Sequence, residues 1–595
     1  ATQAALAGAA HVITHTSHDN RVIANSIEPR GCYAELDGDR LHLGFNGQGV
    51  WGTKGDLVKW LGLSEDQVRV TNPDVGGGFG MKGMGYPEHF LVAHAARTLG
   101  RPVRWMSDRT EAMLSDNAGR DLDVTTTLAF DAGLKLVAFQ TDSLSNMGAY
   151  VSQFGQNIQS ALYSKVLTGT YDVQTYFFRN RGIFTNTTQV DAYRGAGRPE
   201  AIYALERAMD FAARQLGVNP LDLRRRNFIA PEAFPYRSAT GELYDVGDFH
   251  RVLARAETLA DIAGFATRRA ATEAQGKLRG LGLCYYIESI LGDPEETATI
   301  EITDTGARVY VGTQSNGQGH ETVYAQLLHD QTGLPLDQIE IVQGDSDQIA
   351  KGGGTGGSRS VTVQGTAMRT TAEALITGLC GFLDADMDQR DTSFDPAEGV
   401  FRAPGSNVVI TLLEAAARAN AAGRPDLAKV SKTTTLPGRS YPNGCHIAEI
   451  EIDRDTGATR VDRYTVVDDF GNLMNPRLAE GQVHGGIAQG IGQALTEHVV
   501  YDSDGQLLTA TFMDYGMPRA DDTPFVAFYT EPVPSTANPL GMKGCGEAGT
   551  VGALAAVANA VQDALWPLGI RQVDMPFTPA RVWAMLQHGG AIAAE

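Results

Sequence analysis

Four segments of the chain combine glycine with amides, hydroxyls or a lone acid, and they hold the residues best suited to binding and chemistry. They are 76–80 (GGGFG), 316–320 (NGQGH), 352–360 (GGGTGGSRS) and 543–550 (KGCGEAGT). Glycine lets the backbone approach a ligand closely, and successive N–H groups can bind phosphate oxygens. A single such loop is most often only a tight turn. Four of them in one chain indicate a site for a large phosphorylated cofactor.

Glu547 is the acid of the last segment and lies between two glycine-bearing turns. Taken alone, a glutamate in such a place is more often a capping or solvent-exposed acid than a catalytic one. In a partly desolvated site, burial raises the pKa of a carboxyl group and makes it a better general base. A carboxylate such as Glu547 can therefore serve as a general base in a partly desolvated site.

The segment 78–83 (GFGMKG) also fits the GxGxxG pattern of dinucleotide-binding folds, after a strand-like run at 67–71 and before a helix. Two observations disfavour that fold. No convincing acid ends a second strand about twenty residues later, and 99–105 contains Arg-Pro-Val instead of a clean buried strand. The sequence has no Walker-type phosphate loop, and 319–324 (GHETVY) lacks the second histidine of a zinc-protease helix.

Net charge and cysteine spacing disfavour other classes of protein. The formal net charge of −21, without a run of Lys or Arg long enough to offset it locally, disfavours binding to nucleic acid or anionic lipid. The five cysteines are far apart and form no C-x-x-C pair, so any iron–sulfur cluster has to be on another chain. The most apolar long stretch, 551–570, is interrupted by polar residues, and we predict no membrane span. We expect a cytoplasmic location, with periplasmic export alongside a partner as the alternative.

Short alternating runs and amphipathic stretches predict an α+β fold. The runs at 34–43, 127–139 and 298–311 each reverse at a glycine-containing turn and predict hairpins. The stretches at 88–99 and 200–216 predict helices that end before a glycine.

The length of 595 residues exceeds what one hydrophobic core supports, so at least two large domains are expected. The polar, Ala-rich stretch at 263–279 precedes a new apolar run and marks the predicted boundary. We predict a first domain at 1–265, a linker at 266–279 and a second domain at 280–595.

Taken together, the motifs resemble those of one family. GGGFGMK, AYRGAGRPE, NGQGHE, GTGGSRS, GQVHGG and KGCGEAGT occur in the order seen in molybdenum hydroxylases of the xanthine oxidase family. The chain resembles the molybdenum-cofactor-binding subunit of xanthine, aldehyde and carbon monoxide enzymes, over about 25–557. The resemblance implies two large molybdopterin-binding domains of mixed sheets and helices, elongated, with the cofactor between them. Because the family's N-terminal hammerhead-like domain is not recognisable here, we expect a separate polypeptide to supply it.

The resemblance also implies the cofactor, a molybdenum ion on a molybdopterin, in bacteria usually as the cytosine dinucleotide. The pterin dithiolene holds the metal, and the protein supplies no direct metal ligand. The glycine loops are the expected cradle of this anionic cofactor. The expected cofactor-binding residues are Gly78, Phe79, Gly80, Gly317, Gln318, Gly319, His320, Thr355, Gly356, Gly357, Ser358, Arg359, Ser360, Asn475, Gln482 and Lys543.

Three residues resemble the catalytic groups of the family. Glu547 matches the glutamate that takes a proton from the hydroxyl that attacks the substrate, water being the oxygen source. Gln48 lies 31 residues before Phe79, the interval between the family's glutamine at the metal and its phenylalanine. Arg194 resembles an arginine close to the metal. The resemblance further implies that two electrons leave through a 2Fe–2S subunit, followed by an FAD subunit.

The loop after Arg194 limits the substrate. Aerobic carbon monoxide dehydrogenases have a copper-binding cysteine directly after this arginine, but here Gly195 follows and a soft Cu(I) ion would lack its thiolate. Ala196 stands where xanthine enzymes place an aromatic ring, which disfavours xanthine. The resemblance implies a substrate pocket formed by Ala196, Tyr285, Tyr286 and Glu288.

The predicted function is the catalytic subunit of a molybdenum hydroxylase that oxidises an aldehyde or an aromatic N-heterocycle. The alternatives are a carbon monoxide dehydrogenase-like subunit and a molybdopterin-binding scaffold without turnover. The joint presence of Glu547, Gln48 and the glycine cradle disfavours the scaffold.

Overall fold

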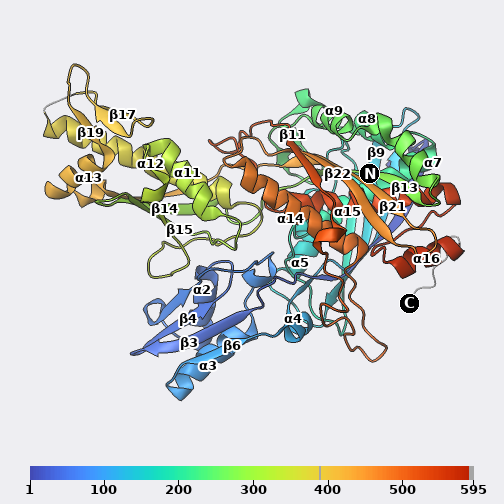
Figure 1. The fold of residues 1–595 in the computed structure, drawn as a ribbon, viewed down its shortest axis with the longest axis horizontal. Coiled ribbons are helices and arrows are strands. Elements are labelled where there is room, and N and C mark those ends of the chain that lie inside the picture. The colour runs from blue at the N-terminus through green and yellow to red at the C-terminus, as the bar shows by residue number, and fades with distance from the viewer. Residues whose placement is uncertain (388–389, 589–595) are drawn as a thin grey trace.

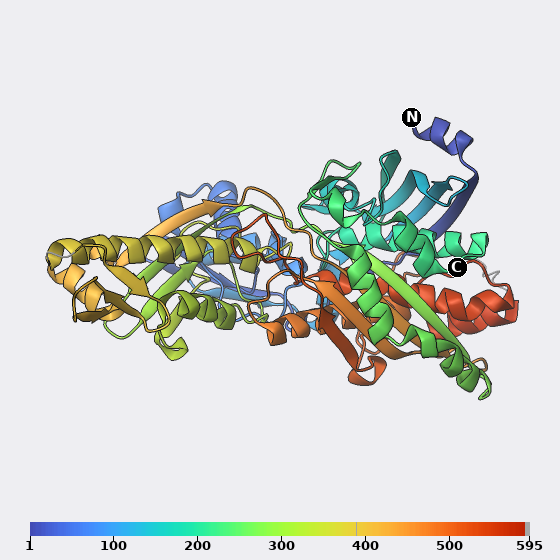
Figure 2. The same cartoon turned by 90° about the horizontal axis from the view of Figure 1, so that it is seen from above.

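A computed structural model describes residues 1–387 and 390–588. The molecule is elongated, with two smaller lobes at one end and a larger body at the other (Figures 1 and 2). Helices and sheets alternate irregularly along the chain, in agreement with the predicted α+β class.

The first small lobe is built from the N-terminal part of the chain, drawn in blue in Figure 1. Its mixed sheet has the order β5-β4-β3-β6, formed by Val68–Thr71, Arg40–Phe45, Gly31–Asp37 and Val103–Met106. Alternate residues of β4 and β5, such as Leu41, Leu43 and Val70, are buried beneath α2 (Trp51–Leu61) and α3 (Pro87–Leu99). The antiparallel β3–β4 pair and α3 confirm the hairpin predicted at 34–43 and the helix predicted at 88–99.

The second small lobe, drawn in yellow-green in Figure 1, contains the sheet β16-β15-β14-β20. Its strands are Ile339–Val342, Ala307–Val311, Glu295–Ile302 and Lys429–Thr435, so the predicted hairpin at 298–311 is confirmed as β14–β15. Two helices pack against this sheet and each other, α11 (His320–Thr332) and α12 (Ser360–Asp386). Both helices start directly after a glycine-rich segment, which places those segments at one edge of the lobe.

In the large body, two helices lie between two sheets. The first sheet is β1-β8-β9-β10, formed by His11–Asp19, Leu122–Phe130, Leu136–Gly148 and Tyr176–Phe184. The second is β13-β21-β22-β23, formed by Leu278–Ile287, Asn443–Ile452, Thr459–Asp469 and Val526–Thr530. Helix α7 (Arg198–Leu216) packs on the first sheet, α15 (Ala548–Leu565) packs on the second, and the two helices pack on each other. The hairpin predicted at 127–139 and the helix predicted at 200–216 are confirmed as β8–β9 and α7.

Helix α15 lies unusually close to strand β13. A Cβ atom at Gly280 or Gly282 would collide with the backbone carbonyl of Ala560 or Ala556. Small residues on both sides therefore allow the helix backbone to touch the sheet, as glycine does wherever two backbones approach closely. This packing fixes the start of α15, where Glu547 lies, relative to the second sheet.

One buried core runs through both sheets of the body, and its residues extend from Leu122 to Met585. The predicted linker at 266–279 contains helix α10 (Phe265–Glu273) and the first residues of β13. The division into domains at this point stays a prediction, and its end at residue 595 lies outside the described residues.

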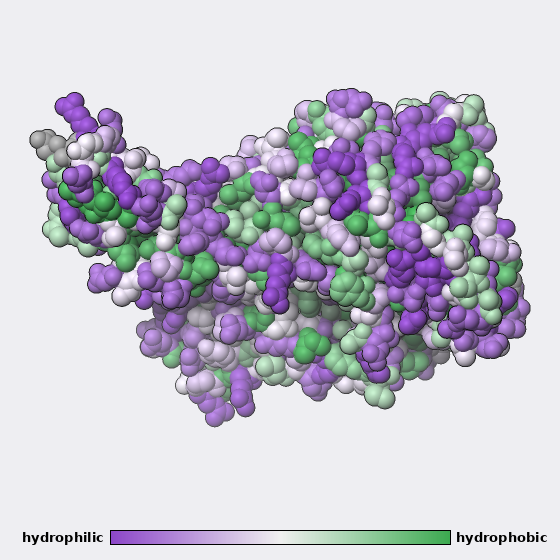
Figure 3. Space-filling view, turned by 45° about the horizontal axis from the view of Figure 1, so that its top comes forward, coloured by the Kyte–Doolittle hydropathy of each residue, from purple (hydrophilic) through white to green (hydrophobic). Residues whose placement is uncertain are grey.

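The part of the apolar stretch 551–570 that lies in α15, 551–565, is buried inside the body. No helix among the described residues is long and apolar enough to cross a membrane. The face seen in Figure 3 is mostly hydrophilic, with apolar residues scattered in small groups.

Candidate active site

A cavity of about 1230 Å³ opens where the two small lobes meet the large body. All four glycine-rich segments identified in the sequence contribute to its lining. The volume exceeds the roughly 300–1000 Å³ of an ordinary small-molecule site. The cavity therefore has room for a long cofactor and a substrate together.

Several helices begin at this cavity. Residues of the first turn of α2, α7, α11, α12 and α14 (Pro476–Leu495) line it, and Glu547, which precedes α15, lines it as well. The first turn of a helix carries N–H groups without helical partners and a partial positive charge. A cavity surrounded by helix N-termini is a favourable environment for phosphate groups and carboxylates.

The charged side chains at the cavity wall have the sign that an anionic cofactor requires. The lining contains eight Lys and Arg residues and three acids, in a chain whose net charge is −21. The acids are Asp56, Asp293 and Glu547, and the basic residues are Lys59, Lys82, Lys351, Lys543, Arg194, Arg198, Arg359 and Arg439. Four of these cations pair with acids, Lys82 with Glu28, Arg198 with Glu547, Arg359 with Glu296 and Lys543 with Asp469. The positive charge toward a phosphorylated ligand therefore rests on the other four, which form no ion pair among the described residues.

Free hydrogen-bonding groups also fit a phosphorylated ligand. In the described part of the chain, the N–H groups of Gly356 and Gly357 have no protein acceptor, and neither does Nδ1 of His320. Burial lowers the pKa of His320 to about 4, so this ring is neutral at physiological pH and one of its nitrogens carries a hydrogen. These residues fit the molybdopterin cofactor that the motifs imply.

Many polar side chains predicted as cofactor contacts also hold the loops of the cavity together. Oγ1 of Thr355 donates to the carbonyl of Gln314 at 2.7 Å, and Nε2 of Gln318 donates to the same carbonyl at 3.3 Å. Arg359 binds three backbone carbonyls and the Glu296 carboxylate, and it is 2% exposed. These side chains shape the cradle, in which the backbone N–H groups of 356–357 remain as donors for a ligand.

Asn475 and Lys543 have similar supporting positions. Oδ1 of Asn475 caps α14 by accepting from the N–H of Leu478 at 2.9 Å. Nζ of Lys543 pairs with the fully buried carboxylate of Asp469. Of the other predicted contacts, Gly78, Phe79, Gly80, Gly317, His320, Gly356, Gly357, Ser358, Ser360 and Gln482 line the cavity, whereas Gly319 is not among its lining residues.

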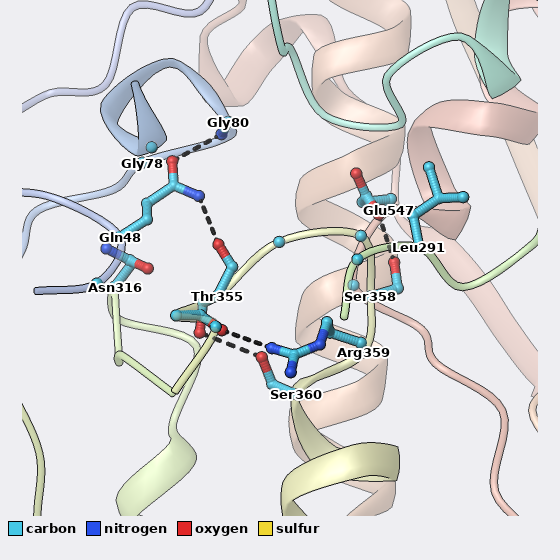
Figure 4. A pocket seen from close by; sticks show the side chains of 18 of the residues that line it. Gln48, Gly78, Gly80, Leu291, Asn316, Thr355, Ser358, Arg359, Ser360 and Glu547 are labelled. Atoms are coloured by element: carbon cyan, nitrogen blue, oxygen red, sulfur yellow. Dashed lines mark hydrogen bonds between the residues drawn. The ribbon is translucent and has the colours of Figure 1, made fainter. Parts of the chain in front are cut away.

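Gln48 links two of the glycine segments across the cavity (Figure 4). Its Oε1 accepts from the N–H of Gly80 at 2.9 Å, and its Nε2 donates to the carbonyl of Thr355 at 2.9 Å. A primary amide has two hydrogens on its nitrogen, so one remains for a ligand. The structure thus brings Gln48 to the cavity wall, while its predicted place at the metal stays a prediction.

Arg194 is buried and lines the cavity between Phe79 and helix α14. Its guanidinium carbon lies 5.9 Å from the centre of the Phe79 ring. Its Nε donates to the carbonyl of Gly546 at 2.7 Å, and an Nη2 hydrogen reaches the carbonyl of Gln482 at 2.9 Å. Arg194 therefore ties the loop before α7 to the segment that carries Glu547.

Glu547 is held by three donors. Its Oε1 accepts from the N–H of Gly195 at 2.7 Å, and its Oε2 accepts from Arg198 and from the Ser358 hydroxyl, each at 2.8 Å. Figure 4 shows the carboxylate facing Ser358 with Leu291 beside it. Burial alone would raise the pKa of Glu547, but Arg198, Ser358 and Gly195 outweigh it and hold the pKa below its ordinary value. Desolvation, which can raise the pKa of a general base, is therefore outweighed at Glu547 by hydrogen bonds to the ionised form.

The predicted substrate pocket needs correction. Ala196 lines the cavity, but Tyr285 and Tyr286 are fully buried away from it. Tyr285 packs edge-on against Phe228 and donates to Asn443 at 3.2 Å, while Tyr286 donates to Asp468 at 2.9 Å. Both belong to β13, whose two faces are covered inside the body, so neither ring lines the cavity.

Glu288 also does not line the cavity. It is fully buried behind Glu547, and its Oε1 pairs with Arg198 at 3.0 Å and lies 3.1 Å from the Ser358 hydroxyl oxygen. Its place is therefore next to the candidate base and not at the substrate.

Sequence reasoning missed one wall of the cavity. Ile158 and Leu162 line it from a π-helix (Ile158–Leu162), next to Phe154 and Asn157, and Leu291 lines it from the other side. The π-helix touches the loop of Ala196, because a Cβ atom at Gly197 would collide with the carbonyl of Ile158. Single turns of π-helix are frequent at functional sites. No motif marks this segment in the sequence, and only its packing against Gly197 reveals it.

The chain is similar to known molybdopterin-binding proteins. Family models described as molybdopterin cofactor-binding domains match residues 1–228 and 255–524. The nicotine 6-hydroxylase large subunit of Paenarthrobacter nicotinovorans is 32% identical over 97% of this chain and 74% of its own. The carbon monoxide dehydrogenase large chain of Hydrogenophaga pseudoflava is 31% identical, over 99% and 76%. The structure of quinoline 2-oxidoreductase from Pseudomonas putida 86 has a TM-score of 0.92 at 32% identity, covering 99% of this chain and 78% of that one.

Fold and site thus define a molybdopterin-binding protein of two cofactor-binding domains. The chain belongs to the xanthine oxidase family of molybdenum hydroxylases, in which it is the catalytic, molybdenum-dependent oxidoreductase subunit. Relatives named as a large subunit or large chain are parts of multi-subunit enzymes. The predicted family, fold class and class of reaction are confirmed.

Proposed function

We propose that the chain hydroxylates an electron-poor carbon of an aromatic N-heterocycle. The observation that carries this proposal is the position of Glu547, whose ionised carboxylate lies beside an otherwise apolar part of the cavity wall. That part is formed by Phe79, Ile158, Leu162, Ala196 and Leu291. A flat ring can be buried there at a gain of about 25 cal/mol for each Å² of apolar surface removed from water.

The relatives support a heterocyclic substrate. Two of the similar proteins described above are named for nicotine and quinoline, which contain ring nitrogens. A ring nitrogen withdraws electrons from the adjacent carbon, and this makes that carbon susceptible to attack by an oxygen nucleophile. Aldehyde oxidation, which the sequence leaves open, is one outcome of the test below.

Different residues of the chain accept the proton, hold the base in place and bind the cofactor. Glu547 accepts a proton at a carboxylate oxygen, and its low pKa keeps it in the accepting form at neutral pH. Arg198 and the N–H of Gly195 hold that carboxylate in place, and the apolar wall excludes water. Gln48, Arg194 and the N–H groups of 356–357 would hold the cofactor. When bound, molybdenum supplies the two-electron acceptor and an activated water-derived oxygen.

We further propose that the molybdopterin carries a cytosine dinucleotide and that a 2Fe–2S subunit, followed by an FAD subunit, receives the electrons. The cavity volume and the basic lining support the longer, more highly charged form of the cofactor. The wide separation of the five cysteines supports clusters on a partner. Analysis of the nucleotide released from the purified protein tests the first point.

Oxidation of carbon monoxide is disfavoured by Gly195. Its φ is +98°, and a Cβ atom there would collide with Cγ of Pro199. The loop therefore has no room for a cysteine in its present conformation, and the soft ligand that Cu(I) prefers is missing at this position.

The test compares substrates with the holoenzyme and its partner subunits. Quinoline and nicotine, an aromatic aldehyde and carbon monoxide are supplied in water labelled with oxygen-18, and labelled product and reduced acceptor are measured. We expect turnover of a heterocycle, with one labelled oxygen in the product. Turnover of the aldehyde or of carbon monoxide alone would contradict the proposal, as would bound NAD in place of molybdenum.

A further inference from the structure

Two buried carboxylates share the same donors at the inner end of the cavity. Oε2 of Glu547 and Oε1 of Glu288 both lie next to the Ser358 hydroxyl, at 2.8 and 3.1 Å. Arg198 also bridges them, at 2.8 Å from Glu547 and 3.0 Å from Glu288. Arg198 and Glu288 have no exposed side-chain surface.

If both acids were ionised, the shared hydroxyl of Ser358 would have too few hydrogens to bond to each of them. Ser358 has one hydroxyl hydrogen, and it can be donated to only one of the two acids. If it goes to Glu547, which is closer, the Ser358 oxygen faces Oε1 of Glu288 as one acceptor facing another. This contact becomes favourable when Glu288 carries a hydrogen. Charge points the same way, because Arg198, which contacts both acids directly, can neutralise only one buried carboxylate.

We propose that Glu288 is a neutral carboxylic acid that donates to Oγ of Ser358, while Ser358 donates to Glu547. Glu288 is then a positioning residue for the base, and this inference rests on the proposed role of Glu547. The arrangement leaves Glu547 as the single anion opposite Arg198. Arg198 and Ser358 both donate to Oε2 of Glu547, so the carboxylate keeps one orientation toward the cavity.

Further observations support this chain. Oε2 of Glu288 has no hydrogen-bond partner among the described residues, as a neutral acid tolerates better than a carboxylate. Burial raises the pKa of Glu288 to about 8, and the charge of Glu547 adds to this rise while Arg198 opposes it. The other titratable groups that interact with Glu288 are Arg194, Tyr286 and Cys545.

The backbone of Ser358 is built for this position. Its φ is +60°, in the left-handed region that a serine seldom adopts. Its carbonyl lies so close to Gly544 that a Cβ atom there would collide with it. Two segments distant in sequence therefore hold the hydroxyl between the two acids, which is the kind of local strain found at functional sites.

The test uses infrared spectroscopy, which detects the C=O band of a protonated carboxyl group without turnover. We expect such a band at neutral pH in the wild-type protein and its loss in Glu288→Gln. Ser358→Ala removes the acceptor of the Glu288 O–H group and should shift this band. Glu497→Gln is the matched control, because Glu497 is another buried acid whose pKa is raised to about 8 but which bonds to Tyr515. That variant should remove a different band and leave the Ser358-sensitive one unchanged.

Stability gives a second readout on the same variants. The pKa of Glu288 is higher in the folded state than in the unfolded state, so its proton stabilises the fold at low pH, and this contribution is lost as pH rises through about 8. Glutamine cannot ionise. The midpoint temperature of Glu288→Gln relative to wild type should therefore rise between pH about 5 and about 9.

Two results would overturn the inference: equal bands in wild type and Glu288→Gln, or a midpoint difference that falls with pH. If Glu288→Gln does not fold, the Ser358→Ala spectrum still decides, since a band unmoved by that change means that Glu288 does not donate to Ser358. Failure of the proposed function can be told apart from failure of this inference. Retained turnover in Glu547→Gln would refute the base while leaving the infrared band of Glu288 in place.

Discussion

At Glu547, burial and hydrogen bonding act on the pKa in opposite directions. Desolvation favours the protonated acid, whereas Arg198, Ser358 and the N–H of Gly195 favour the carboxylate and prevail. A charge-assisted hydrogen bond contributes roughly 1.5–3 kcal/mol, so three of them can outweigh the desolvation of one acid. The base is therefore ionised before a substrate arrives, and a proton acceptor need not be generated during the reaction.

This ionised state predicts the effect of Glu547→Gln. We expect kcat/KM to fall by about a hundredfold to ten-thousandfold, because an amide cannot accept the proton. Molybdenum and pterin content should stay at the wild-type level, since the side chain contributes no metal ligand. Steady-state kinetics and metal analysis on the same preparation measure both. Glu373→Gln, which removes an exposed acid of α12 paired with Arg369, is the control for lost charge. Wild-type turnover in a fully loaded Glu547→Gln enzyme would remove this residue from the mechanism.

Among the elements, the helix N-termini do most to define the cavity. Five helices direct residues of their first turn to it, and α15 begins directly after Glu547. The positive end of α15 favours an ionised Glu547, by typically 0.3–1 kcal/mol in exposed positions and more when partly buried. Glycine segments precede α11 and α12, so that backbone donors and helix ends act on the same ligand.

Gly356 offers a test of this cradle. A Cβ atom there meets nothing within 4 Å in the protein, and the position needs no positive φ. Gly356→Ala should therefore fold like wild type, but it should lower the molybdenum and pterin content, because the methyl group occupies space against the cofactor. Thermal unfolding and metal analysis measure the two effects.

Gly381→Ala is the matched control, because Gly381 lies within α12, the helix that follows the segment of Gly356. Its Cβ atom also meets nothing within 4 Å, and alanine in a helix interior should stabilise the protein by about 0.5–1 kcal/mol. Full cofactor content in Gly356→Ala would show that the cofactor does not approach this glycine.

At the scale of the whole molecule, the net charge of the chain and the charged residues of the cavity wall differ in sign. The chain carries a net charge of −21, but its cavity wall contains eight basic residues against three acids. The outer surface is therefore unsuited to anionic polymers, while the cavity attracts an anionic cofactor. The five cysteines are all free and dispersed, and no group of His, Cys, Asp and Glu among the described residues could hold a metal ion.

We predict that this chain, loaded with cofactor but separated from partners, oxidises about one substrate molecule for each active site and then stops. Adding back the 2Fe–2S subunit should restore continuous turnover, because electrons then have a path out. Rapid-mixing experiments that count product per molybdenum measure this. Continuous turnover of the isolated chain with a dye would contradict the predicted dependence on a partner.

The sequence by itself determined the family, the cofactor and the candidate base. Glycine segments keep their meaning without tertiary context, because their chemistry lies in the backbone of consecutive residues. Hairpins such as β3–β4 and helices such as α3 and α7 were also predictable, because neighbouring residues specify them through turns and periodic patterns.

Only the tertiary structure decided which side chains meet. Tyr285 and Tyr286 are on a strand buried on both faces, and no local pattern shows that the cavity lies elsewhere. The low pKa of Glu547 depends on Arg198 and Ser358, which are separated from it by 349 and 189 positions. The π-helical wall and the buried Glu288 are likewise products of packing. Distances and electrostatic fields arise when distant segments fold together, and they cannot be derived from neighbours along the chain.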